Sequence, residues 1–114
     1  MDMIKTAIFS LLLMMSTAAF AQNYPPTKTY EVRVGEVRLP SVDNGTITVR
    51  ECAKCDYETH QVTPRTTYAL NGKNMSLEDF RELVEALRRD GGHVVNVRRD
   101  IQSDTITQVF IYTQ

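Results

Sequence analysis

Residues 76–92 have the sequence SLEDFRELVEALRRDGG, which predicts the one clear helix of the chain. Its apolar residues recur at intervals of three and four, the spacing that places them on one face of an α-helix. Ser76 is a good N-cap, and Asp79 falls in the first turn, where the helix dipole favours negative charge. Gly91 and Gly92 follow the last turn and can adopt the left-handed conformation that ends helices.

Short segments rich in β-branched residues lie on both sides of this helix and predict strands. Four precede it, and two follow it at 94–98 and 105–112. The order β-β-β-β-α-β-β is typical of an α+β fold. We expect a small, mainly antiparallel β-sheet with one amphipathic helix packed on one face, and we expect 105–112 to lie in its centre.

The four strands before the helix are separated by glycine, proline and turn residues. Apolar residues recur at every second position up to Val34, but the next one, Val37, comes three residues later. This change at Gly35 predicts a β-bulge or a tight bend. Pro64 is expected to end one strand before the next begins at residue 66. The strands are therefore predicted at 30–39, 46–50, 57–63 and 66–70.

Residues 1–21 have the pattern of a cleavable export signal. Lys5 supplies the positive charge, residues 7–15 are apolar, and Ala19-Phe20-Ala21 places small residues before the cleavage site. The apolar run is shorter than the roughly 20 residues that span a membrane, so we expect cleavage and no membrane span afterwards.

Removing 21 residues from 114 leaves 93, which is enough for one domain. We expect a flexible arm at 22–28 and a single α+β domain at 29–114. The mature protein is expected to be soluble and either periplasmic or secreted.

The overall charge excludes one class of partner. The chain has 13 Lys and Arg against 14 Asp and Glu, a net charge of −1, which is not the balance of a basic nucleic-acid binder. The sequence contains no glycine-rich phosphate loop and no nucleophile elbow, so we expect no catalytic residues and no cofactor. We therefore expect a non-enzymatic binding or accessory module with a protein partner in the periplasm or envelope.

The motif most capable of redox or metal chemistry is Cys52-Ala53-Lys54-Cys55. In an exported protein, two cysteines are most simply a disulfide. The flanking segments predict a hairpin with Ala53-Lys54 at its tip, and cysteines facing each other across such a tip lie within disulfide range.

Two alternatives to a structural disulfide stay open. The first is thiol–disulfide exchange, for which Lys54 supplies positive charge but Glu51 and Asp56 oppose it. The second is a metal site, because the spacing of Cys52, Cys55 and His60 matches three positions of a zinc knuckle.

Arginines near the helix end predict a candidate surface for anions or for a partner. Arg88 and Arg89 close the helix, and Arg98 and Arg99 lie in the next strand. Arginine forks bind carboxylate and phosphate, so these four residues form a candidate binding patch. The alternative is a solvated edge in which these arginines form salt bridges, such as Glu85–Arg89 on the helix.

Overall fold

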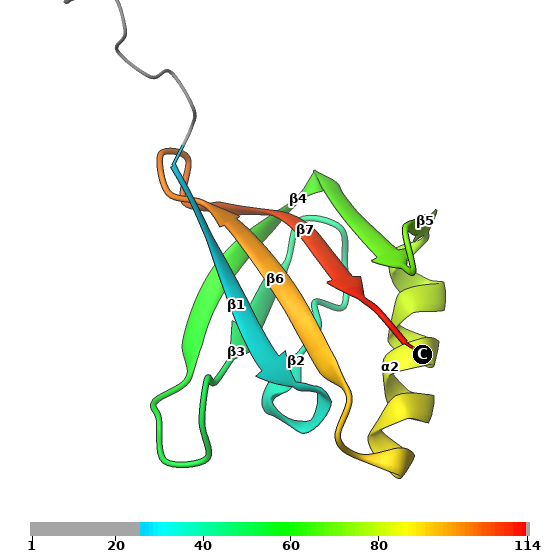
Figure 1. The fold of residues 1–114 in the computed structure, drawn as a ribbon. Helices are drawn as coiled ribbons and strands as arrows, with labels where there is room; N and C mark the ends of the chain where they lie inside the picture. Colours follow the sequence, from blue (N-terminus) through cyan, green and yellow to red (C-terminus); the bar gives the residue numbers. More distant parts are fainter. Residues whose placement is uncertain (1–25, 114) are drawn as a thin grey trace, which may run out of the picture.

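The computed structural model describes residues 26–113, and in this part of the chain one helix lies against a seven-stranded sheet (Figure 1). The predicted α+β class with one helix is confirmed. The elements in chain order are β1 (Thr27–Arg33), the 3-10 helix η2 (Val34–Glu36), β2 (Val37–Arg38), β3 (Thr46–Val49), β4 (Glu58–Leu70), β5 (Lys73–Met75), α2 (Leu77–Asp90), β6 (Val94–Asp100) and β7 (Thr105–Ile111).

The sheet is mixed, which corrects the prediction of a mainly antiparallel sheet. Its strand order is β1-β6-β7-β4-β3-β2, with β5 paired to β4. The pairs are antiparallel except for β4 and β7, which run parallel in the middle of the sheet. The segment from β5 through β6 joins them, and a connection containing a helix is what a parallel pair requires. As predicted, β7 is central and forms a hairpin with β6.

The sheet also curls into a half-barrel, with β1, β6 and β7 facing β3 and the first half of β4 (Figure 1). The rings of Tyr30 in β1 and His60 in β4 have centroids 5.3 Å apart, although two strands separate β1 from β4 in the sheet. Helix α2 flanks the half-barrel, so the apolar interior is enclosed by the two walls and the helix.

Strand β4 makes the bend between the two walls, and here the prediction of two separate strands is wrong. Pro64 interrupts the pairing with β7, whose register shifts between Val62 and Thr67, but the strand continues. Proline has no N–H to donate, so a bulge forms at this position. The Thr66 hydroxyl donates to the Ile106 carbonyl at 2.6 Å and holds the bulge against β7.

The parity change at Gly35 is a tight bend, one of the two predicted forms. Residues Val34–Glu36 form one turn of 3-10 helix, and such a turn repeats every three residues. Val34 and Val37 therefore both point inward, with 2% and 0% of their surface exposed.

Both predicted ends of the helix are confirmed. The Ser76 hydroxyl accepts a hydrogen bond from the Asp79 N–H at 3.1 Å. Gly91 has φ +66° and donates its N–H to the Leu87 carbonyl, as a glycine C-cap does. Helix α2 therefore has its predicted bounds, and Leu77, Phe80 and Val84 of its apolar face are buried.

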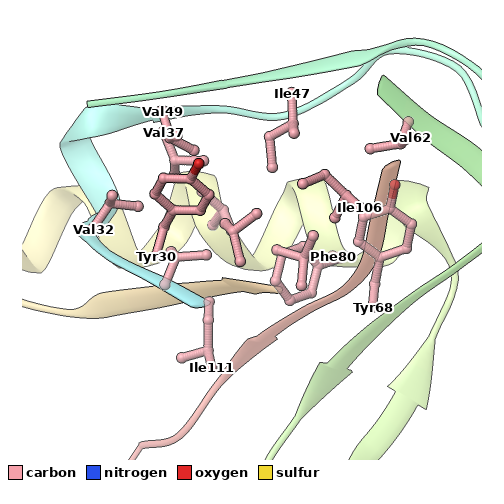
Figure 2. Close-up of a cluster of buried hydrophobic side chains, with 14 of the residues drawn as sticks. Tyr30, Val32, Val37, Ile47, Val49, Val62, Tyr68, Phe80, Ile106 and Ile111 are labelled. Carbon is pink, nitrogen blue, oxygen red and sulfur yellow. The ribbon is translucent and has the colours of Figure 1, made fainter. Parts of the chain in front are cut away.

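The core fills the half-barrel and is built mainly from valine and isoleucine (Figure 2). Phe80 inserts from the helix, and its ring centroid lies 5.5 Å from that of Tyr68. The buried cluster consists of Tyr30, Val32, Val34, Val37, Ile47, Val49, Val62, Tyr68, Leu77, Phe80, Val84, Val95, Val97, Ile106, Val109 and Ile111.

The predicted export signal at 1–21 lies outside the described residues, as do residues 22–25 of the predicted arm. Strand β1 begins at Thr27. Among residues 26–113, no helix is long and apolar enough to cross a membrane.

Candidate functional site

A groove runs between α2 and the segment at 38–43, which we call the α2 groove. It consists of two cavities of about 660 and 500 Å³ that share Glu78 and Arg81. The first is lined by Arg38, Leu39, Glu78, Arg81, Glu82, Val84, Glu85, Ala86, Arg88 and Arg89. The second is lined by Ser41, Val42, Asp43, Ser76, Leu77, Glu78 and Arg81.

Local sequence explains why this space is open. Strand β2 is only two residues long, because Leu39 and Pro40 follow it and Pro40 cannot donate to a sheet ladder. The chain from there to β3 forms bends and turns beside the helix instead of a strand. Leu39, Val84 and Ala86 are the apolar residues that line the first cavity, and the other helix side chains that line it carry charges of both signs.

Of the four arginines that line the α2 groove, one forms an ion pair among the described residues. Arg88 binds the Glu85 carboxylate at 2.7 Å and the Val37 carbonyl at 2.6 Å. The ion pair expected between Glu85 and Arg89 is not the one that forms. Among residues 26–113, no ion pair engages the other three groove arginines, Arg38, Arg81 and Arg89.

The groove continues at Arg38 into the loop between β3 and β4. The Arg38 guanidinium lies 5.1 Å from the ring centroid of Tyr57, and that of Arg50 lies 4.5 Å from the same ring. Arg50 is held by Glu36, with Nη2 and Oε2 2.5 Å apart. The Tyr57 ring is therefore close to two guanidinium groups: that of Arg50, which a carboxylate fixes, and that of Arg38, which lines the groove.

The same loop contains the predicted disulfide, which the structure confirms. Cys52 and Cys55 are bonded, with their Cα atoms 5.0 Å apart, and the Cys55 N–H donates to the Cys52 carbonyl at 3.1 Å. Ala53 and Lys54 form the turn, as predicted. The paired strands end earlier, at Val49 and Glu58, so the loop is longer than a two-residue hairpin connection.

The surroundings of the disulfide bear on the two alternative roles. Both cysteines are exposed in a turn rather than at the N-terminus of a helix, the usual source of a stabilised thiolate. For metal binding, both sulfurs are already bonded to each other, and the His60 ring packs against Tyr30 inside the half-barrel. No group of three or more His, Cys, Asp or Glu residues within 26–113 is placed to hold a metal ion.

Two buried polar atoms have no hydrogen-bond partner in this part of the chain: His60 Nε2 and the Tyr68 hydroxyl. Burial, with a smaller contribution from Asp43, raises the pKa of Tyr68 to about 12. Because Tyr68 is 4% exposed, its hydroxyl is part of the core rather than of an open site.

The four arginines of the predicted patch divide into two locations. Arg88 and Arg89 line the α2 groove. Arg98 donates to the Gln108 side chain at 3.1 Å, and its guanidinium lies 5.3 Å from the Phe110 ring centroid. Arg99 binds Asp104, whose hydrogen bond raises the pKa of the guanidinium.

Two groove residues, Arg38 and Arg81, were not among the candidates from the sequence. Arg81 precedes Arg88 by two helical turns, so helical periodicity places them on one flank and could have grouped them. No sequence pattern groups Arg38 with these residues, because it lies in β2 and only the tertiary structure brings it beside α2.

No protein-family model matches the chain, and searches of curated proteins and of solved structures find no match.

Proposed function

We propose that the protein is an exported binding module that holds an extended, carboxylate-bearing segment of a protein partner in the α2 groove. The observation that carries this proposal is the set of three groove arginines, Arg38, Arg81 and Arg89, that form no ion pair among residues 26–113. Arginine forks bind carboxylates through two parallel hydrogen bonds, so these side chains are suited to an acidic peptide.

The shape of the groove favours an extended segment rather than a small ligand. The two cavities follow one another along α2 and share Glu78 and Arg81. Leu39 and Ala86, which also line the first cavity and are not buried, supply apolar surface for contact. Acidic side chains of a bound peptide would pair with the three arginines, at positions away from Glu78, Glu82 and Asp43 of the same lining.

Export is supported by two features of the sequence and fold. The first 21 residues have the pattern of an export signal. The bonded cysteines, Cys52 and Cys55, are typical of oxidising compartments such as the periplasm.

The test is a titration of the 15N-labelled mature chain with a synthetic peptide of alternating Glu and Val, followed by NMR. The amide signals of α2 and of residues 38–43 are expected to shift. Arg81→Gln and Arg89→Gln should each weaken binding by about tenfold, because each removes a charge-assisted contact. Arg65→Gln is the matched control, because Arg65 is exposed in β4 and does not line the groove.

A peptide of alternating Lys and Val should bind more weakly than the acidic peptide. Equal binding of both peptides, or shifts confined to other surfaces, would show that the α2 groove does not select carboxylates.

Thiol–disulfide exchange is a second candidate function, favoured by the exposure of Cys52, Cys55 and the residues between them. Incubation with a glutathione redox buffer, followed by mass spectrometry, measures the reduction potential of the pair. A potential in the range of known disulfide oxidants would support exchange, and a much lower one would support a structural bond.

A further inference from the structure

Among residues 26–113, β1 is the longest strand that pairs on one side only. It stands at the opposite end of the sheet order from β2 and pairs with β6 on one side, over Thr27–Arg33. The other edge strands are shorter: β5 has three residues, and β2 has two, whose Val37 carbonyl already accepts a hydrogen bond from Arg88. An unpaired edge of seven residues is long enough to accept another strand.

The hydrogen bonds identify which backbone groups of β1 face the open side. The Val34 N–H donates to the His93 carbonyl, which extends the ladder in which Val32 pairs with Val95. In an antiparallel pair, alternate residues bond to the partner strand and the residues between them point away. The N–H and C=O groups of Glu31 and Arg33 therefore point to the free edge.

The side chains of the same two residues are also free. Glu31 and Arg33 are exposed, while Val32 between them is 1% exposed and belongs to the core. Neither charge takes part in an ion pair or a side-chain hydrogen bond within the described chain. Two opposite charges without partners thus lie two residues apart along an open strand edge.

We propose that β1 pairs antiparallel with β1 of a second copy of the chain, in the register that places Glu31 opposite Arg33. The two-fold symmetry centred on Val32 forms this ion pair twice, and each Glu31–Arg33 pair also exchanges main-chain hydrogen bonds. The buried faces of both strands stay on the same side of the combined sheet, which extends across the two copies.

Charge selects this register from its neighbours. A shift by two residues in one direction places Glu31 opposite Glu31, and the opposite shift places Arg33 opposite Arg33. A shift by four residues in the first direction places both charges opposite threonines and forms no ion pair, and in the opposite direction it places them opposite residues beyond the end of β1. A shift by one residue would place exposed side chains opposite buried ones. The contact is short, so we expect a weak, concentration-dependent dimer.

The test is sedimentation velocity of the mature chain over a wide concentration range. The wild type should show a monomer–dimer equilibrium. Glu31→Arg creates two Arg–Arg contacts and Arg33→Glu creates two Glu–Glu contacts, so each should raise the dissociation constant by about tenfold or more. An equimolar mixture of the two variants should dimerise like the wild type, because the mixed dimer contains two ion pairs again.

Hydrogen exchange gives an independent readout of the register. On dimerisation, the amides of Glu31 and Arg33 should gain protection, whereas those of Tyr30 and Val32 already bond to β6. Asp90→Arg is the matched control, because it makes the same change in charge at the exposed end of α2.

Three results would overturn the proposal. The first is a monomer at every concentration, and the second is a dimer that neither single variant weakens. The third is a mixture of variants that fails to recover dimerisation. In that case, any dimer that the wild type forms does not depend on ion pairs between Glu31 and Arg33.

Discussion

The guanidinium of Arg88, near the end of α2, donates a hydrogen bond to the main-chain carbonyl of Val37 at 2.6 Å. Val37 begins β2, the last strand of the sheet order, so this bond ties the helix to the far edge of the half-barrel. The Glu85 carboxylate holds the same guanidinium at 2.7 Å. The contact fixes one wall of the α2 groove and satisfies an edge carbonyl that lacks a neighbouring strand.

Replacing this arginine should therefore destabilise the fold. Arg88→Met keeps much of the aliphatic contact but leaves the Val37 carbonyl without its charged donor, at a cost of about 1–2 kcal/mol. Urea denaturation followed by circular dichroism measures the change. Arg89→Met is the matched control and should change stability by less than about 0.5 kcal/mol. Equal effects of the two variants would mean that the bond to Val37 contributes nothing.

Removal of the disulfide should lower stability without changing the fold. The loop closed by Cys52 and Cys55 is very short, so the chain-entropy model assigns the bond about 2 kcal/mol. The double variant Cys52→Ala/Cys55→Ala should lose about this much in urea denaturation. Reductant should produce the same loss in the wild type and none in the variant. A variant that fails to fold would show that the loop organises the core.

Tyr68 should make stability fall at alkaline pH. Burial raises its pKa from 10.0 to about 12, so from pH 10 upward the unfolded chain releases a proton that the folded chain retains. The contribution of Tyr68 to the free energy of unfolding is therefore fully present below pH 10. It is lost as the pH rises towards 12, by up to about 2–3 kcal/mol. Tyr68→Phe should remove this part of the pH dependence.

At neutral pH, Tyr68→Phe should change stability by less than about 1 kcal/mol, because the hydroxyl has no partner to lose within residues 26–113. Tyr112→Phe is the control, because this tyrosine is 67% exposed. If both variants give the wild-type profile between pH 10 and 12, Tyr68 does not determine the alkaline loss.

The mass of the exported protein should show both that the signal at 1–21 is removed and that Cys52 and Cys55 are oxidised to a disulfide. We expect a chain that begins at Gln22 and is lighter than the reduced form by two hydrogens. Native mass spectrometry after expression in a bacterial host, without chelator, measures this directly. A reduced chain that carries a zinc-sized adduct would contradict the structural disulfide and make Cys52, Cys55 and His60 the candidate metal ligands.

Several parts of the fold follow from short stretches of sequence. The helix begins after Ser76 and ends at Gly91 because capping and left-handed termination depend on a few adjacent residues. Asn71 and Gly72 both have positive φ and form the tight turn between β4 and β5. The disulfide follows from two cysteines across a turn, which is also a local relationship.

The interruption at Pro64 shows where local rules fail. Proline does break the ladder, as its missing N–H requires, yet β4 continues because Thr66 bonds to Ile106 across the bulge. That contact depends on the parallel position of β7, which residues 58–70 do not encode by themselves. The same holds for the arginines: Arg88 and Arg89 meet Arg38 in the α2 groove, while Arg98 lies over Phe110 in the sheet.

The sequence by itself determined the α+β class, the helix with its two ends, most strand positions, the central place of 105–112 and the disulfide. These features depend on periodicity, capping and turn chemistry, which act over a few residues. Only the tertiary structure decided the parallel pairing of β4 with β7, the curl into a half-barrel, the α2 groove and the free edge at β1. Each of these depends on which distant segments bury their apolar faces together, a choice made by the packing of the whole core.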